Sequence, residues 1–216
     1  MFIGHFAVGL AGKKLAPRTS LGTLIAAACF LDILWPIFLL AGWETVRIDP
    51  GNTAFTPLNF VFFPWSHSLL MTLIWSALFA LGYFLLTRYK RGAIAIAIGV
   101  VSHWVLDVIS HRADMPLAPG SAVRVGLGLW NSVAWTVIVE GAMFIVAIWL
   151  YARSTRPTSK VGTYAFWSFV AVLILLYVSD RFSPPPTSTA LLPIFGIAAW
   201  IFIPWSWWFD RNRRRV

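Results

Sequence analysis

Three side chains that can bind a metal recur at four-residue spacing in the segment His103–His111. They are His103, Asp107 and His111, and the residues between them are mostly apolar. On an α-helix, residues four apart lie on the same face. An ionisable side chain at membrane depth is costly and normally lines a cavity or a site, so a group of three needs a shared reason. The spacing therefore predicts a metal centre.

The geometry of a helix limits how many of these side chains can share one ion. With a rise of about 1.5 Å per residue, His103 and Asp107 lie about 6 Å apart along the axis, whereas His111 lies about 12 Å from His103. His111 is therefore expected to serve a second metal, to hold a substrate oxygen or to support a ligand. Cys29 is the only cysteine. Histidine and carboxylate ligands without thiolates favour zinc, with manganese or iron as alternatives.

Two further carboxylates lie inside apolar segments. Asp32 is expected to join the metal centre, since an ionised group in lipid is expensive, although a neighbouring hydroxyl could also pair with it. Pro36 removes the hydrogen bond to the carbonyl of Asp32, which predicts a kink there. Glu140 could be a ligand, a general base or a structural partner.

The two remaining histidines lie near predicted helix ends. His67 follows a plausible N-cap, Ser66, and the start of a helix favours a neutral histidine, so His67 is either a ligand or a capping residue. The segment Met1–Gly12 is too short to cross a membrane. If Lys13 anchors it at the cytoplasmic face, a short helix could carry His5 inward to the depth of the other ligands; it could equally lie flat on the surface.

The composition places these residues in an integral membrane protein. Hydrophobic residues make up 59% of the 216, charged residues make up 12%, and the mean hydropathy is +0.76. Because a span needs roughly 20 apolar residues, we expect an all-α polytopic fold with a short N-terminal helix and six transmembrane helices. The predicted spans are Ser20–Trp43, His67–Thr87, Gly92–His111, Leu127–Tyr151, Thr163–Ser179 and Thr189–Phe209.

The basic residues predict the orientation. Most of the 17 lysines and arginines fall at residues 13–18, 88–91, 153–160 and 211–215, at span ends that share one side. The loops of the other side hold Arg47, Arg112, Arg124 and Arg181, offset by Glu44, Asp49, Asp114 and Asp180. The positive-inside rule then places both termini in the cytoplasm. The Arg211–Arg215 cluster adjoins Trp205, Trp207 and Trp208, so it is expected to anchor to lipid and not to bind nucleic acid.

The ionisable residues expected in the membrane all fall in the first part of the chain. We therefore predict a metal-site domain over residues 1–151 and a two-helix scaffold over residues 152–216. The site is expected to open between the first four spans, toward the non-cytoplasmic face.

The chain resembles the bacterial membrane-bound metal-dependent hydrolases, some of which are described as LexA-binding inner-membrane-associated hydrolases. Roughly residues 1–150 carry the resemblance, in Gly4-His5, Leu31-Asp32, Trp65–Ser68, His103–His111, Pro116–Pro119 and Val125–Ser132. The family has been grouped with zinc-dependent phospholipase C. The resemblance implies a location in the inner membrane and a set of metal ligands, with His111 adjacent, that comprises His5, Asp32, His67, His103 and Asp107. The phospholipases also carry a later His-x-x-x-Glu pair, whereas Thr136 precedes Glu140 here.

Together these features predict a membrane-embedded metal-dependent hydrolase that acts on a lipid or lipid-linked phosphoester, with membrane lipids as its partners. A metal would acidify a bound water and polarise a phosphoryl oxygen, while Glu140 or His111 handles protons. Two alternatives use the same residues: a proton- or ion-coupled transporter, and a non-catalytic scaffold whose helices are tied together by a metal.

Overall fold

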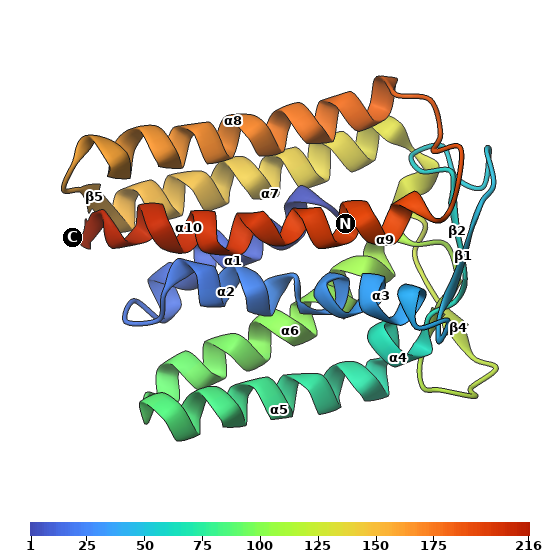
Figure 1. The fold of residues 1–216 in the computed structure, drawn as a ribbon, viewed down its shortest axis with the longest axis horizontal. Helices are drawn as coiled ribbons and strands as arrows, with labels where there is room; N and C mark the ends of the chain where they lie inside the picture. The colour runs from blue at the N-terminus through green and yellow to red at the C-terminus, as the bar shows by residue number, and fades with distance from the viewer.

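The protein is a bundle of helices that run roughly along one axis, with short strands at its two ends (Figure 1). The computed structural model describes residues 1–216 apart from the side chain of Arg181, whose predicted place among the outer charges lies outside the description. In the described chain, five helices are long and apolar enough to cross a membrane. They are α5 (Leu69–Thr87), α6 (Lys90–Ser110), α7 (Val133–Ser154), α8 (Lys160–Phe182, its span ending at Asp180) and the continuous segment Leu191–Arg211. That last segment comprises α9 (Leu191–Ala198), η2 (Ala199–Ile201) and α10 (Phe202–Arg211).

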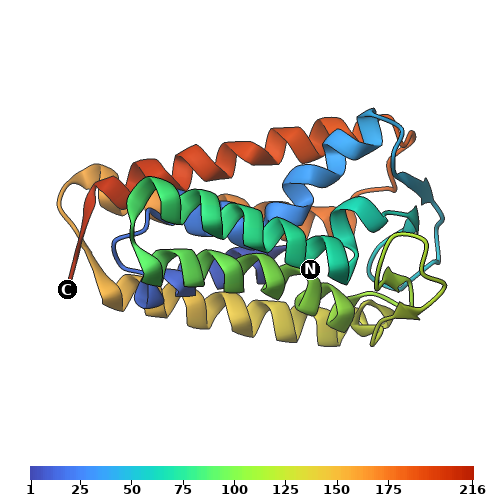
Figure 2. The ribbon, with the colours of Figure 1, turned by 90° about the horizontal axis from the view of Figure 1, so that it is seen from below.

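A sixth predicted span is present as two half-helices. They are α2 (Leu21–Ala28) and α3 (Phe30–Leu40), which meet at an angle of 59°, and Figure 2 shows α3 leaning away from the common axis. The kink predicted at Pro36 was therefore misplaced, because the chain breaks at Cys29. Pro36 stays inside α3, where its ring packs against Gly196 of α9. The expectation of a mainly helical protein is confirmed, and with the bent pair up to six segments of the described chain are long and apolar enough to cross a membrane.

The short N-terminal helix α1 (Ile3–Leu15) lies inside the bundle, not flat on its surface. Most of its residues are buried, and it packs against α2, α6 and α7. Gly9 permits the close approach to α2, because a Cβ there would lie 2.9 Å from the Cα of Ile25. Met1 is only 5% exposed and lies near the middle of the bundle (Figure 1). The first residue therefore lies inside the bundle and not at its basic end.

Short antiparallel strand pairs close the two ends of the bundle. At one end, β1 (Thr45–Ile48) pairs with β2 (Leu58–Phe62), and β3 (Met115–Pro116) pairs with β4 (Arg124–Val125), near α4 (Pro64–His67) and η1 (Leu129–Asn131). At the other end, β5 (Thr155–Pro157) pairs with β6 (Arg213–Arg215). The turns that carry the basic clusters gather at this second end (Figure 1). The predicted charge asymmetry is thus a feature of the fold.

A buried polar network at the basic end fixes the depth of α1. Lys13 Nζ donates to Asp210 Oδ2 at 2.6 Å and to the carbonyl of Thr19 at 2.9 Å. Asp210 also accepts hydrogen bonds from the backbone N–H of Leu21 and the hydroxyl of Tyr151. Four helices, α1, α2, α7 and α10, are joined at this point. Removing one partner of such a buried pair costs about 3–5 kcal/mol, because the other charge is left unpaired.

The positions of the turns give a test of the topology. Reporter domains fused after Lys90, at the basic end, and after Gly120, in the loop between β3 and β4, should report opposite sides of the membrane. Matching readouts from the two fusions would remove one crossing and contradict the arrangement of spans described here.

Candidate metal centre

Five of the predicted ligands converge from four helices. Their nitrogen and oxygen atoms form two overlapping sets, each with all atoms within 4.8 Å of one another. One set is His5, His103 and Asp107, and the other is Asp32, His67 and His103. The helices α1, α3 and α4 supply one residue each, and α6 supplies His103 and Asp107. The fold thus gathers residues that are up to 102 positions apart in the chain.

The distances within this cluster fit a small divalent metal. His103 Nε2 lies 3.2 Å from Asp107 Oδ2 and 3.7 Å from Asp32 Oδ1. His67 Nε2 lies 3.7 Å from Asp107 Oδ2 and 3.6 Å from Asp32 Oδ1. In a tetrahedral site with bonds of about 2.0–2.2 Å, neighbouring ligand atoms lie about 3.3–3.6 Å apart. The four distances, from 3.2 to 3.7 Å, are close to this spacing, so each pair of atoms could be neighbouring ligands of a small divalent ion.

His103 shows how the cluster could hold a cation. Its Nδ1 donates to the carbonyl oxygen of Ala28 at 2.8 Å, so the lone pair of the neutral ring lies on Nε2. The side chain is 0% exposed, and Nε2 has no hydrogen-bond partner among the residues that the structure describes. It faces carboxylate oxygens, which are also acceptors. Acceptor atoms that face one another in an apolar interior repel each other. A positive ion bound between them would remove this repulsion, as in a set of metal ligands.

The break between α2 and α3 makes this orientation of His103 possible. In a continuous helix, the carbonyl of Ala28 would accept a hydrogen bond from the backbone N–H of Asp32. Because the chain leaves helical geometry at Cys29, this carbonyl is available to His103. Asp32 falls in the first turn of α3, where the helix dipole favours a carboxylate.

His67 is oriented by Ser66, its neighbour in α4, and by Glu44, which lies beyond the end of α3. Its Nδ1 lies 2.6 Å from the hydroxyl of Ser66. That hydroxyl donates to Glu44 Oε2 at 2.6 Å, and Glu44 Oε1 accepts from the backbone N–H of Ser66 at 2.7 Å. Glu44 is 2% exposed. Burial raises the pKa of its carboxyl above the ordinary value, although the nearby His67 ring and the bonds from Ser66 oppose the shift.

The two carboxylate oxygens of Asp107 face different neighbours. Oδ1 contacts His5 Nε2 at 3.1 Å and the amino group of Met1 at 2.5 Å, whereas Oδ2 faces His67 and His103. The ring of His5 stacks on that of His103, with centroids 3.7 Å apart. The side chain of Asp32 is 50% exposed, whereas those of the other four are at most 6% exposed. The cluster therefore opens to its surroundings at Asp32.

Glu140 lies outside both sets of ligand atoms. Its Oε2 accepts hydrogen bonds from the backbone N–H groups of Phe2 and Gly4, at 2.9 and 3.2 Å. Such groups at the start of a helix have no partner within the helix and attract negative charge. Of the three roles left open by the sequence, this geometry favours that of structural partner, since Glu140 caps the helix that carries His5.

His111 also lies outside the two sets. Its Nδ1 pairs with Asp114 Oδ1 at 2.9 Å, and its ring packs against Phe60, Phe63 and Trp130. Phe63 contacts both His111 and one member of the cluster, His67, with ring centroids 5.9 and 5.6 Å away. The geometry excludes none of the predicted supporting roles, but it does not place His111 among the converged ligand atoms.

Sequence reasoning missed Glu44 and Ser66 as parts of this centre. Glu44 was assigned only as a loop charge that offsets Arg47, and Ser66 only as an N-cap. The 22 residues between them form no spacing that predicts contact. The one available signal was the position of Glu44 directly after an apolar segment, and this position does not indicate which residue Glu44 contacts.

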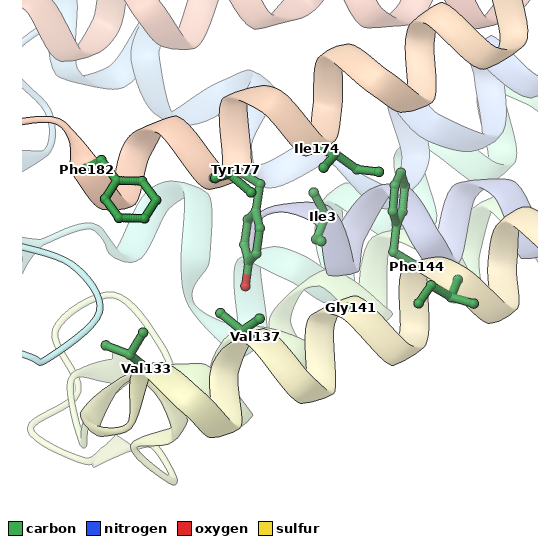
Figure 3. A pocket seen from close by; sticks show the side chains of 10 residues that line it. Ile3, Val133, Val137, Gly141, Phe144, Ile174, Tyr177 and Phe182 are labelled. Carbon is green, nitrogen blue, oxygen red and sulfur yellow. The ribbon is translucent and has the colours of Figure 1, made fainter.

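An apolar cavity lies apart from the cluster, between α7 and α8. It has a volume of about 580 Å³, and Ile3 forms part of its wall (Figure 3). The side chains of Val137, Phe144 and Ile174 point toward it, with Gly141 on the same face of α7. Apart from Tyr177, the lining offers no polar side chain among the described residues. The cavity therefore suits hydrocarbon and not the chemistry of a metal.

Comparisons with protein-family models, with curated proteins and with solved structures found no match to this chain. The resemblance to the membrane-bound hydrolases thus stays a prediction from the quoted motifs.

Substitution of Asp107 tests the cluster. Asp107→Asn keeps the size of the side chain but removes its charge, and we expect purified protein to lose at least most of its bound metal while it remains inserted and folded. Asp114→Asn is the matched control, because Asp114 pairs with His111 outside the two sets. Metal analysis of both variants is the measurement; equal metal content in the two would argue against the cluster as a metal site.

Substitution of Glu140 separates capping from catalysis. In Glu140→Gln the amide oxygen can still accept from Phe2 and Gly4, so we expect unchanged metal content and turnover within a few-fold of the wild type in any assay that detects activity. A general base would behave differently. A loss of about 10²–10⁴-fold in turnover with metal retained would assign the base role to Glu140.

Proposed function

We propose that this protein is a membrane-embedded metal-dependent hydrolase. The observation that carries the proposal is the convergence of His5, Asp32, His67, His103 and Asp107 inside an apolar bundle. Ionisable side chains at this depth mark functional sites as a rule. Nitrogen and carboxylate donors with one open side suit a catalytic zinc, with manganese or iron as alternatives.

The residues of the chain would have separate tasks. His67 and His103 present Nε2 lone pairs because their Nδ1 atoms are engaged by Ser66 and Ala28. Asp32, the exposed ligand, lies where a substrate can approach. A bound divalent metal would supply Lewis acidity that polarises a phosphoryl oxygen and acidifies water. His111, held by Asp114, is the side chain that we propose for moving protons at the outer side of the cluster.

A lipid or lipid-linked phosphoester is the substrate class that this setting favours. Asp32 lies in α3, within the bent pair of half-helices, so in a membrane its half-exposed side chain would meet the lipid level and not an aqueous loop. The apolar cavity between α7 and α8 adds a second place for hydrocarbon. The charge asymmetry supports a cytoplasmic basic end, and the resemblance of the motifs supports the bacterial inner membrane.

Ion-coupled transport is the second candidate, and the bend of 59° between α2 and α3 favours it. Discontinuous helices with free backbone groups at mid-membrane form the ion and substrate sites of many transporters. Here the half-helices meet beside His103, so the same geometry would serve a transported cation. Hydrolysis and transport differ in what they need, because only transport requires two compartments.

One preparation distinguishes the two functions. Protein purified in detergent should contain a divalent metal and should release a water-soluble phosphate product from mixed phospholipid vesicles, and a chelator should abolish the release. Asp107→Asn is expected to be inactive. If the protein instead moves metal ions across sealed proteoliposomes without releasing any product, transport replaces hydrolysis as its function.

A further inference from the structure

We infer that Glu44 is a positioning residue of the metal centre, which acts through Ser66 to hold His67 in the tautomer that directs Nε2 at the ion. The inference rests on the proposed function, since it concerns the same centre. It adds a residue that touches none of the five converged ligands. Glu44, Ser66 and His67 are 2%, 0% and 4% exposed, so the three groups are shielded from water that could replace their hydrogen bonds.

The number of protons available in the contacts Glu44–Ser66–His67 determines which atom donates in each hydrogen bond. The hydroxyl of Ser66 has one proton and donates it to Glu44 Oε2 at 2.6 Å. Its contact of 2.6 Å with His67 Nδ1 must therefore be a bond in which the N–H of the ring donates. A neutral histidine with its proton on Nδ1 carries the lone pair on Nε2. That atom faces Asp32 and Asp107 at 3.6 and 3.7 Å.

The backbone holds Glu44 in place from the side of α3. The N–H groups of Trp43 and Glu44 both donate to the carbonyl of Phe38, at 2.9 and 3.2 Å. Glu44 is thus attached to the end of the helix that carries Asp32, and its carboxylate reaches α4, which carries His67. One side chain therefore sets the position of one ligand relative to another as well as the tautomer of His67.

Capping of α4 does not account for all of these contacts. A cap needs only an acceptor for backbone N–H groups, and Glu44 Oε1 meets this need by accepting from Ser66. The other oxygen, Oε2, accepts a hydrogen bond from the hydroxyl of Ser66, and this hydroxyl also contacts His67. Hydrogen bonds of this kind typically change metal affinity by 10–100-fold when they are removed.

Glu44→Gln tests the inference with almost no change in size. If the amide oxygen keeps the backbone N–H of Ser66, the amide NH₂ faces the hydroxyl and donates to it. The hydroxyl then turns its proton toward His67 Nδ1, which moves the proton of the ring to Nε2. We expect ¹⁵N NMR of metal-free protein in detergent to show Nδ1–H at His67 in the wild type and Nε2–H in the variant. The chain has four histidines, and a His67→Gln spectrum identifies the signal.

Metal affinity gives the second readout. Zn²⁺ titration should show an affinity lowered by about 10–100-fold in Glu44→Gln and in Ser66→Ala, which removes only the hydroxyl. Ser68→Ala is the matched control, because Ser68 is equally buried but its hydroxyl accepts from the backbone N–H of Met71 as the N-cap of α5. This control should bind Zn²⁺ as the wild type does, although loss of a cap lowers its thermal stability.

The outcomes separate this inference from the proposed function. An unchanged tautomer in Glu44→Gln together with wild-type Zn²⁺ affinity overturns the positioning role while the metal centre stands. An equal loss of affinity in Ser66→Ala and Ser68→Ala also overturns it, because local destabilisation would then explain both. Failure of the wild type to bind any metal refutes the proposed function, and the tautomer measurement still decides the role of Glu44.

Discussion

The cost of placing ionisable side chains among apolar helices governs this structure. Lipid offers no hydrogen bonds, so each polar atom at membrane depth needs a partner supplied by the chain or by a bound ion. The converged histidines and aspartates meet this demand for most of their atoms through Ala28, Ser66 and each other. The Nε2 atom of His103 is left facing other acceptors. The break between α2 and α3, the inward course of α1 and the short helix α4 all bring polar groups to this one place.

The depth of α1 links the centre to the far end of the molecule. The ion pair of Lys13 with Asp210 holds the last turn of α1 against α10, while Glu140 binds its first turn. His5 lies between these two attachments. Side chains from α8 and α10, among them Phe169 and Phe202, share one hydrophobic core with Phe6 of α1. The residues after 152 therefore help to place His5, one of the candidate ligands.

The His/Asp cluster and the apolar cavity lie in different parts of the bundle. The cluster is closed on most sides and opens at Asp32, the only one of the five converged residues whose side chain is half-exposed. The cavity between α7 and α8 is lined almost wholly by apolar side chains.

The sequence by itself determined the class of the protein and most members of the cluster. Hydropathy gives long apolar helices because lipid demands them, and the cost of buried charge singles out His103, Asp107 and Asp32. The tertiary structure alone decided whether α1 dips inward, where the broken span bends, and that Glu44 reaches His67 through Ser66. Those outcomes depend on contacts between distant segments, which no local spacing encodes. At the break at Cys29, the carbonyl oxygen of Ala28 accepts from His103, a residue 75 positions away that no local pattern around Cys29 indicates.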